Sequence, residues 1–470
     1  MSPLRAKAPR IREKRLDAIG AWLGTTSAAV AEFSGDEVVQ RIRTFAQSTY
    51  DDLIYALRIT ATIKNSVTVL HAPRGCAAAG LAHAVAGSNT IWASTNLDER
   101  DTIMGADGKL RKAVTSLFHR HRPDVIFIVA SPVVAINNDD IQSVVEELHE
   151  ELEVPIVPIY VTGFASRTAV TGYDSALHAL VKYLAGTGAA EEQVEVVNLL
   201  SVAEHPADRN EAERLLRELG LSLVTIPDNA DIRDFRKAIG ARASIPLCPD
   251  APEYLGQILR EKYGVPLINA PRPVGIAGTG AWLAAVGSAL GREDEATALH
   301  ARYKAETEQR LAGFSLSGVT VYISLAAANA FAVFELVEEL GGTVAGLTIS
   351  HLDRLHLPHL RELSARQPDL QIHVANGQAF EEASIVRSIS PGLYIGDGLH
   401  VPQIARLAIP VVSLEGTPVI GYGGVIGLVR RIRMALGFRG FGVLLGNSAT
   451  PYHDAWFRRS QNWHIKQEVK

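Results

Sequence analysis

The sequence predicts an α/β fold in which parallel sheets are flanked by helices. Short runs rich in β-branched residues recur along the chain, and each ends in Gly, Pro or a small polar residue and is followed by helical periodicity. That alternation is typical of βαβ units, whose buried parallel strands read as continuous apolar runs. The chain has 470 residues, and a prior of roughly 150 residues per domain indicates about three domains.

Eight runs carry this prediction. They are residues 66–72, 124–132, 154–163, 222–228, 318–326, 370–377, 392–398 and 409–416. Ligands of parallel sheets gather at the carboxyl ends of strands, so the residues just after each run are the first candidates for a site.

Domain boundaries are expected near residue 205, within SVAEHPADRN, and near residue 312, after the charged helix HARYKAETEQRL. The division is therefore 1–205, 206–312 and 313–470. The segment from residue 446 onward should form a tail packed back on the last domain.

The composition is that of a compact globular protein, with 47% hydrophobic and 21% charged residues. A formal net charge of -5 and the absence of long basic runs argue against nucleic acid or an anionic membrane as partner. Residues 1–16 lack the apolar core of a secretory signal, and no segment of about 18 uncharged apolar residues follows. We expect a cytoplasmic protein without membrane insertion, whose partner is a small molecule or a protein.

The chain has two cysteines, Cys76 and Cys248, too far apart and in the wrong context for a disulfide framework. Cys76 follows the run 66–72 through a Pro73-Arg74-Gly75 turn and is expected to begin an Ala-rich helix. The helix dipole and free N–H groups, with Arg74 beside them, should favour the thiolate, which is the form that binds iron. A small buried hydrophobic side chain is the alternative for this segment taken alone.

Several segments resemble nitrogenase component 1 and its relatives. His71 to Cys76 resembles the family's His-Gly-Pro-x-Gly-Cys, in which the cysteine binds an iron–sulfur cluster at a subunit interface. AINNDDI is similar to the family's Ile-Gly-Asp-Asp-Ile, with Asn138 in place of glycine, and Asn tolerates positive φ. A longer stretch resembles Thr-x-Leu-x-Glu-x-Asp-x-Ile-x-Gly-Gly-x-x-Lys-Leu and matches at Thr95, Leu97, Glu99, Asp101, Ile103, Gly105, Lys109 and Leu110. Residues 161–184, 374–381 and 396–398 match further family segments.

This resemblance covers nearly the whole chain and identifies it as a divergent member of the nitrogenase component 1-type oxidoreductase superfamily. It implies three Rossmann-like domains, an iron–sulfur cluster of [4Fe-4S] type shared with a second component 1-type subunit, and electrons delivered by a separate Fe-protein-type [4Fe-4S] ATPase. The chain contains no GxxxxGK[ST] motif, so ATP is expected to be used by that partner.

The chain departs from the family pattern at two cluster ligands. A full P-cluster type of site uses three cysteines per subunit, whereas here the upstream position falls near Tyr50 and the downstream one at Ser131 or Pro132. A cubane normally needs four thiolates, so three must come from elsewhere. A one-plus-three division between unlike subunits resembles cofactor-assembly scaffolds and chlorophyllide-type reductases. A homodimer with two cysteines, completed by oxygen ligands or water, is the alternative.

Cys248 lies in a Cys-Pro turn between an expected strand and helix, ahead of a family-like Glu-Lys-Tyr-Gly-Val-Pro. In the catalytic nitrogenase subunit and its scaffold relative, a cysteine near this place binds the large cofactor. Cys248 is therefore a candidate cofactor ligand, with a structural thiol as the alternative. The histidine that anchors the other end of that cofactor in the family is replaced here by Ile420.

Two weaker candidates remain. GIAGTGAW contains Gly275, Gly278 and Gly280 but neither the GxGxxG register nor the acidic partner of a dinucleotide site. These glycines are candidates only for close approach of the backbone to a cofactor or substrate. SHLDRLHLPHL contains His351, His356 and His359 without the usual zinc spacing, so surface or capping roles are expected.

Two functions are consistent with these residues. The first is a subunit of a nitrogenase-like, ATP-dependent two-component reductase that passes electrons through the cluster at Cys76 to a substrate or cofactor. The relatives reduce dinitrogen, tetrapyrroles or organosulfur compounds, and no residue selects among these or identifies a catalytic group. The second is a non-catalytic scaffold on which a nitrogenase-type cofactor is assembled. A family member without metal is a third possibility.

Overall fold

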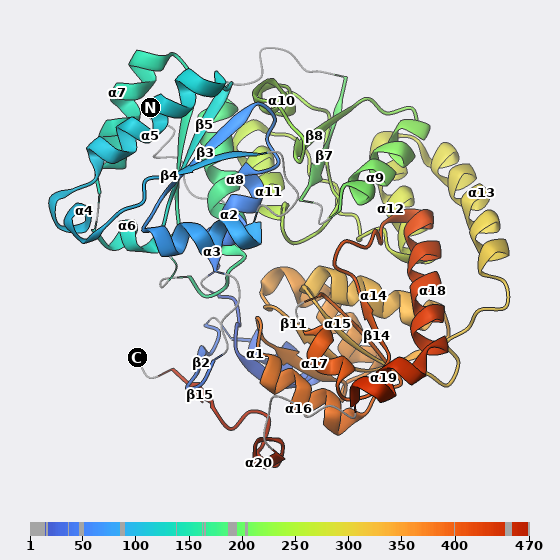
Figure 1. Ribbon diagram of the computed structural model, residues 1–470. Coiled ribbons are helices and arrows are strands. Elements are labelled where there is room, and N and C mark those ends of the chain that lie inside the picture. Colours follow the sequence, from blue (N-terminus) through green and yellow to red (C-terminus); the bar gives the residue numbers. More distant parts are fainter. Residues whose placement is uncertain are drawn as a thin grey trace. The chain divides into compact units, whose positions relative to one another are not determined.

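The computed structural model describes residues 15, 17–35, 37–46, 51–84, 90–137, 139–161, 163, 166–186, 195–202, 205–398, 400–446 and 454–468. The chain folds into two compact units (Figure 1). Unit 1 comprises the described residues of 1–16, 50–202 and 221–268, and unit 2 comprises those of 17–49, 203–220 and 269–470.

Unit 1 contains a four-stranded parallel sheet in the order β4-β3-β5-β6. Its strands are β3 (Ser66–His71), β4 (Ile91–Ser94), β5 (Val125–Ala130) and β6 (Ile156–Tyr160). Alternate residues of a strand face opposite sides of a sheet. In β5, Val125, Phe127 and Val129 accordingly enter one apolar core, while Ile126 and Ile128 enter the other.

Helices cover both faces of this sheet. One core includes residues of α2 (Asp52–Thr60) and α8 (Thr171–Leu184), and the other includes residues of α5 (Asp107–His121) and α7 (Ile141–Leu152). Three further helices follow the carboxyl ends of strands: α3 (Arg74–Ala84) after β3, α4 (Glu99–Met104) after β4 and α6 (Pro132–Asn137) after β5 (Figure 1).

A second parallel sheet of unit 1 has the order β8-β7-β9, formed by β7 (Val197–Ser201), β8 (Leu223–Pro227) and β9 (Ser244–Pro246). Its helices α10 (Ile232–Ala238) and α11 (Glu253–Tyr263) contact α8 of the first sheet. Leu200, Ile226 and Phe235 belong to the same apolar core as Phe127. The two sheets of unit 1 are therefore held by one continuous core.

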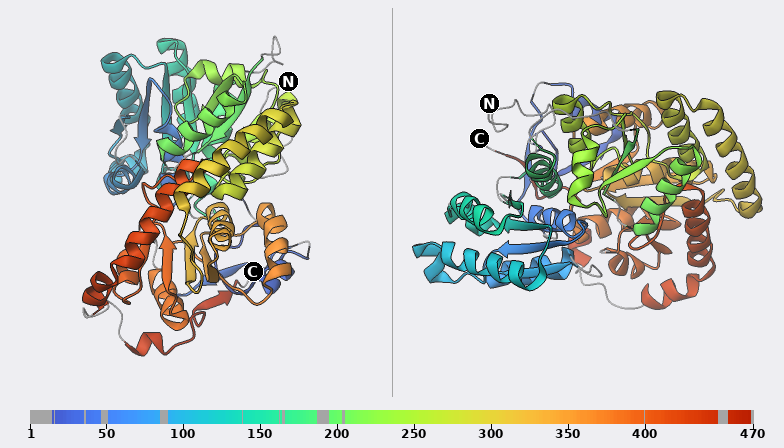
Figure 2. Two further views of the ribbon diagram at one scale, coloured as in Figure 1. Left: turned by 90° about the vertical axis from the view of Figure 1, so that its right-hand side faces the viewer. Right: turned by 90° about the horizontal axis from the view of Figure 1, so that it is seen from above.

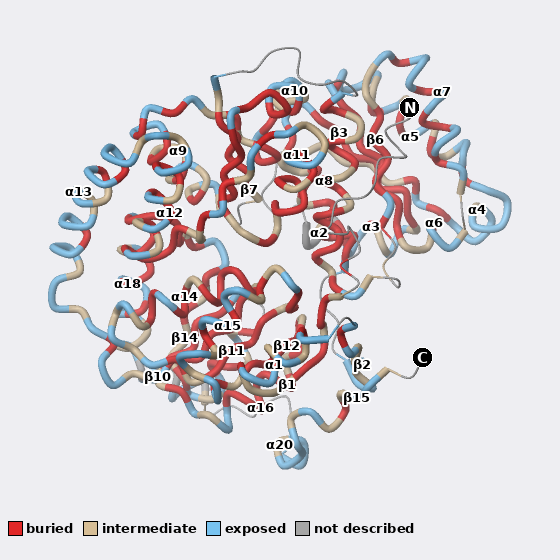
Figure 3. Tube along the Cα trace, turned by 180° about the vertical axis from the view of Figure 1, so that it is seen from behind, coloured by how far each residue is buried: buried red, intermediate tan, exposed pale blue. Residues whose placement is uncertain are grey.

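Unit 2 contains a six-stranded sheet in the order β1-β12-β11-β10-β13-β14. The strands are β1 (Trp22–Thr25), β10 (Thr320–Leu325), β11 (Thr343–Ile349), β12 (Gln371–Val374), β13 (Leu393–Gly396) and β14 (Val411–Ser413). All pairs are parallel except β1 with β12. Figure 3 shows buried residues concentrated along the strands, whereas much of α13 (Glu293–Leu311) is exposed.

The helices of unit 2 precede, separate or follow these strands. In addition to α13 they are α1 (Thr26–Glu32), α9 (Pro206–Glu218), α12 (Gly275–Leu290), α14 (Ala327–Glu339), η3 (Arg354–His356), α15 (Leu357–Arg366), α16 (Ala379–Ile389), α17 (Val401–Ala405), α18 (Gly421–Gly437), α19 (Arg439–Gly446) and α20 (Asp454–Phe457). Helices α12 and α13 pack side by side (Figure 2). Near the C-terminus, β15 (Ile465–Gln467) pairs antiparallel with β2 (Arg41–Arg43).

The α/β prediction is confirmed, because each of the eight predicted runs contains a strand in a parallel pairing. The division at residues 205 and 312 stays a proposal. None of the described helices combines the length and the apolar character that crossing a bilayer requires.

Candidate functional site

Cys76 lies in the first turn of α3, at the carboxyl edge of the first sheet of unit 1. The helix begins at Arg74, two residues earlier than predicted, and Ala77 N donates to Pro73 O at 3.1 Å. The Cys76 thiol is free, partly exposed and packed against the apolar core. Residues in the first turn of a helix lie near backbone N–H groups that have no partner within the helix.

The segment that follows β4 holds the turn between β3 and α3. Ala72 N donates to Thr95 Oγ1 at 3.1 Å, and Leu97 N donates to Ala72 O at 3.0 Å. Pro73 and Leu97 form a parallel bridge beyond the ends of the two strands. The backbone that carries Cys76 is therefore fixed by main-chain and hydroxyl hydrogen bonds.

His71 connects three of the segments that carry the family resemblance. Its Nδ1 lies 3.1 Å from Thr95 Oγ1, and its Nε2 lies 3.2 Å from Asp139 Oδ2. Burial lowers the pKa of His71, although Asp139 opposes the shift. The buried imidazole is therefore neutral at pH 7 and acts as a hydrogen-bonding link. Tyr50 and Asn138, which belong to the same motifs, lie outside the described residues.

Two buried oxygen atoms at this edge have no hydrogen-bond partner among the described residues. Ser131, at the end of β5, is fully buried with its Oγ unpartnered, and its N donates to His71 O at 3.0 Å. Asp52 Oδ1 is likewise unpartnered, while Oδ2 accepts from Gly163 N and Ser166 Oγ, both at 2.8 Å. Buried polar atoms are normally paired, so these two are candidates for contact with a ligand.

Asp52 lies close to the segment that contains Ser131. A Cβ built on Gly163 would lie 2.6 Å from Pro132 Cγ and 3.8 Å from Asp52 Oδ1. The sequence prediction missed Asp52, although the acidic pair Asp51-Asp52 directly follows Tyr50, where the family has a cluster cysteine. Of the three positions where the sequence predicts the family's cysteines, one has the thiol of Cys76, one falls at Ser131 or Pro132, and one lies two residues before Asp52.

This donor set fits one corner of an iron–sulfur cluster. A cubane is held by four thiolates, and unit 1 offers a single thiol at this edge. The residues present are compatible with a cluster whose remaining ligands belong to another polypeptide.

Apolar side chains are exposed on the helices at this edge. Ile103 and Met104 at the end of α4 are 80% and 75% exposed, and Ile136 of α6 is 69% exposed. Helices α4 and α6 contact each other. Exposed apolar side chains that gather in one place are typical of protein interfaces.

Cys248 lies elsewhere in unit 1, between β9 of the second sheet and α11, and is partly exposed. The structure therefore places the two cysteines after strands of different sheets. Ile420, the residue before α18 in unit 2, is buried, and its N donates to Asp208 Oδ1 at 2.8 Å. An apolar, backbone-anchored residue thus occupies the position where the sequence predicts that the family has its histidine.

The glycines of α12 lie close to protein side chains. Gly275 has φ +81, and a Cβ there would lie 2.6 Å from Glu339 Oε2. Glu339 also accepts from Ile276 N at 3.1 Å, and burial raises its pKa. A Cβ on Gly280 would lie 2.4 Å from the His300 ring, whereas Gly278 would meet only Arg272 O at 3.3 Å. Gly275 and Gly280 thus allow the side chains of Glu339 and His300 to lie close to the backbone of α12. That a cofactor binds near these glycines stays a prediction.

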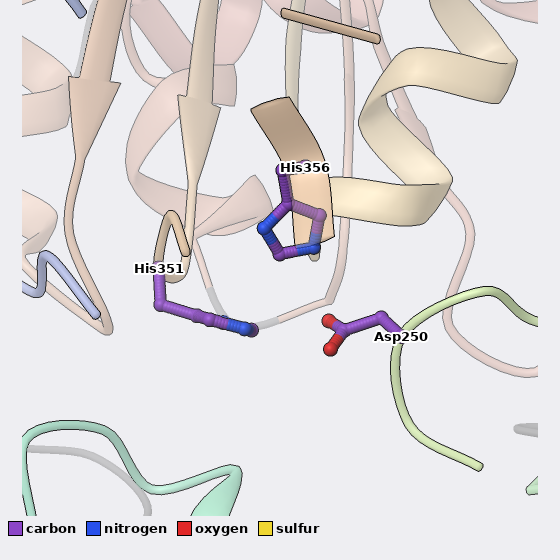
Figure 4. A group of neighbouring side chains, drawn as sticks. All are labelled: Asp250, His351 and His356. Atoms are coloured by element: carbon purple, nitrogen blue, oxygen red, sulfur yellow. The ribbon is translucent and has the colours of Figure 1, made fainter. Parts of the chain in front are cut away.

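The histidines after β11 differ from one another. His351 and His356 are buried, with ring centroids 5.2 Å apart (Figure 4). The expected surface role is therefore wrong for these two, although His356 has the expected capping role, because its Nδ1 accepts from Asp353 N at 3.2 Å. His359 is exposed and stacks on Phe331.

A match to one protein family covers most of the chain. Residues 52–436 match the family described as Nitrogenase component 1 type Oxidoreductase. The chain is 26% identical to a nitrogenase molybdenum-iron protein alpha chain of Methanosarcina barkeri, over 64% of this chain and 60% of that one. It is 23% identical to the alpha chain of Methanococcus maripaludis, over 80% and 84% of the two chains.

A cofactor-assembly protein is about as similar. The nitrogenase iron-molybdenum cofactor biosynthesis protein NifE of Nostoc sp. is 24% identical, over 73% of this chain and 72% of that protein. Among solved structures, Nitrogenase Cp1 at pH 5 superimposes with a TM-score of 0.76 at 17% identity, covering 96% of this chain and 99% of that one. This structural likeness shows the fold.

Proposed function

Since the chain belongs to the nitrogenase component 1-type oxidoreductase family, we propose that it is one subunit of an ATP-dependent two-component reductase. In this proposal Cys76 supplies one thiolate to an iron–sulfur cluster, most simply [4Fe-4S], that is shared with a second component 1-type subunit. An Fe-protein-type ATPase delivers the electrons, since this sequence has no P-loop motif.

The observation that carries the proposal is the position of Cys76. The thiol occupies the first turn of α3, two residues after Arg74, and cysteine sulfur is the ligand that holds iron–sulfur clusters. The hydrogen bonds of Thr95 and His71 fix this turn, so the sulfur is held in place before any metal binds. The unpartnered Ser131 Oγ and Asp52 Oδ1 near the same edge are further potential donors.

A bound cluster would accept and release single electrons at this edge of the sheet. The chain itself contributes the thiolate of Cys76, the N–H groups of α3 that stabilise negative charge, and an apolar core that keeps water from one side. Neutral His71 links the turn before α3 to the segment that contains Asp139 through a hydrogen bond. The exposed Ile103, Met104 and Ile136 offer an apolar surface for the second subunit.

The rival proposal is a scaffold on which a nitrogenase-type cofactor is assembled and then transferred. Two observations favour it over a true nitrogenase subunit. Ile420 replaces the family's histidine anchor, and NifE proteins are among the relatives. In this alternative Cys248 is the temporary cofactor ligand.

Anaerobic purification of the complex that the full-length chain forms with its natural partner tests the proposal. Iron content and cluster absorbance are compared for the unaltered chain, Cys76→Ala and Cys248→Ala. The reductase proposal expects loss of the cluster in Cys76→Ala only, with folding retained, since truncating a cysteine costs about 1 kcal/mol. Complexes without iron, or a cluster that survives Cys76→Ala, contradict the proposal.

The two functions separate in one further assay. A reductase turns over a substrate when the ATPase partner, ATP and dithionite are supplied. A scaffold instead transfers a cofactor to an apo-enzyme, and Cys248→Ala then lowers the transferred amount without affecting the cluster at Cys76.

A further inference from the structure

A basic groove runs along the edge of the first sheet of unit 1. It has a volume of about 800 Å³. One wall is the continuous segment from Trp92 to Asp98, which comprises most of β4 and the residues after it, and the other is one side of α5, with Arg74 at the margin. The groove is therefore elongated and lies between an edge strand and a helix.

The charge of the groove contrasts with that of the chain. Arg74, Lys109, Lys112 and Arg120 line it, against the single carboxylate of Asp98, whereas the whole chain has a net charge of -5. Lys109 is occupied by ion pairs with Asp98 and Asp101. Among the described residues, no carboxylate pairs with the other three cations. The groove thus presents uncompensated positive charge.

The polar side chains of α5 have a regular spacing. Lys112, Ser116 and Arg120 are exposed and four residues apart, so they form one stripe along the helix. With a rise of 1.5 Å per residue, Lys112 and Arg120 are about 12 Å apart along the axis. In an extended peptide, side chains four residues apart on one face are separated by about 13 Å. The distance from Lys112 to Arg120 therefore matches two side chains four residues apart on one face of an extended peptide. Ser116 then lies opposite the side chain between them.

The opposite wall offers backbone groups for pairing. Strand β4 pairs only with β3 among the described strands. Thr95 N donates to Leu70 O of β3, so the alternation along the strand turns the N–H and C=O groups of Ser94 and Trp92 away from β3. The Trp92 Nε1 atom is also buried without a hydrogen-bond partner in the described structure. An edge of this kind accepts an added strand.

We propose that this groove binds an extended acidic peptide segment, which adds as a strand to β4 and directs carboxylates four residues apart to Lys112 and Arg120. Main-chain hydrogen bonds to Trp92 and Ser94 supply affinity, and the basic stripe selects acidic sequences. The segment belongs to another protein that works with this chain. Arg74 and Thr95 line the groove and also belong to the Cys76 site, but Lys112 and Arg120 lie outside that site, so variants of these two residues test the groove alone.

Fluorescence anisotropy with the full-length protein tests the proposal. The probe is a short labelled peptide in which glutamate alternates with valine. A second peptide has the same sequence with alternate backbone nitrogens methylated, which keeps the charge but blocks strand pairing. We expect the first peptide to bind and the methylated peptide to bind at least about tenfold more weakly.

Charge variants complete the test. Lys112→Gln combined with Arg120→Gln should weaken binding by roughly tenfold, since each removes one charge-assisted contact at a solvent-exposed site. The matched control is Arg111→Gln on the same helix, which pairs with Glu147 outside the groove and should leave the affinity unchanged. Equal weakening by Arg111→Gln, or equal binding of both peptides, overturns the proposal. So does binding of inorganic tripolyphosphate without measurable binding of either peptide, which would indicate a small-anion site.

Discussion

His71 Nε2 lies 3.2 Å from Asp139 Oδ2, and this contact ties the end of β3 to the loop that precedes α7. His71 is 1% exposed and its pKa is lowered by burial. In the neutral ring, Nδ1 accepts a hydrogen bond from the Thr95 hydroxyl, and Nε2 carries the proton and donates a hydrogen bond to the Asp139 carboxylate. Its role is to hold the backbone that carries Cys76.

Asp139→Ala should destabilise unit 1, because it leaves the buried His71 Nε2 without its partner. The expected cost is about 1–3 kcal/mol of unfolding free energy, measured by urea denaturation. Glu150→Ala is the control, because Glu150 is an exposed acid on α7 and should change stability by less than about 0.5 kcal/mol. Similar stabilities for the two variants would show that the contact contributes little.

Ser131→Cys tests the unpartnered oxygen at the end of β5. In the complex with its partner, a thiol there should add a ligand and slow the release of iron to a chelator. Thr68→Cys is the matched control, because Thr68 is also fully buried with an unpartnered hydroxyl but lies in the interior of β3. Iron release that is equally fast in Ser131→Cys and in the unaltered complex would place the cluster away from Ser131.

Gly275→Ala should be strongly destabilising. The positive φ strains any L-residue, and the new Cβ would collide with the Glu339 carboxylate. A loss of about 1–3 kcal/mol is expected in thermal or urea unfolding. Gly427→Ala, in the helical part of α18 with open space around it, should instead be neutral or stabilising by up to about 1 kcal/mol. The prediction fails if the two variants unfold alike.

The acid stability of unit 2 should depend on Glu381. Burial raises the pKa of this carboxyl, but hydrogen bonds from His373 and Arg43 outweigh burial and lower the pKa to about 2 from 4.5. Since the folded pKa is the lower one, the stabilisation is present above pH 4.5 and is lost as the pH falls toward 2. The unfolding free energy should fall by up to about 3 kcal/mol over this range.

Glu381→Gln removes the titrating group and should flatten this part of the pH profile. Glu335→Gln is the control, because Glu335 pairs with Arg366 at the surface. Parallel acid profiles for Glu381→Gln and the unaltered protein would assign the acid sensitivity to other groups.

Continuous apolar runs identified strands such as β5, which is buried on both faces. Strands β7 and β11 were missed although they lie inside their sheets. Strand β4 was missed, since Ile91–Ser94 is only four residues long and partly buried throughout. Strand β1 was missed because it is a short edge strand that pairs antiparallel with β12. Local pattern carries little information about such edges.

The candidate site divides in the same way. The Cys76 turn could be predicted because strand, turn and helix are contiguous in sequence. The contact of His71 with Asp139 and the approach of Asp52 to Gly163 join residues 68 and 111 positions apart, so no local pattern encodes them. The burial of His351 and His356 likewise could not be predicted from their spacing in the sequence.

The pairing of β15 with β2 has a consequence for the order of events during synthesis. The last segment of unit 1 ends at Ile268, so a ribosome has made all of that unit while a large part of unit 2 is still missing. Strand β2 (Arg41–Arg43) cannot pair with β15 until residues 465–467 have been synthesised. Until then the buried carboxylate of Glu381 lacks His464, one of its three basic partners. A nascent chain can therefore contain all of unit 1 while unit 2 is incomplete. A chain that ended before residue 464 would lack both the pairing of β15 with β2 and the contact of His464 with Glu381.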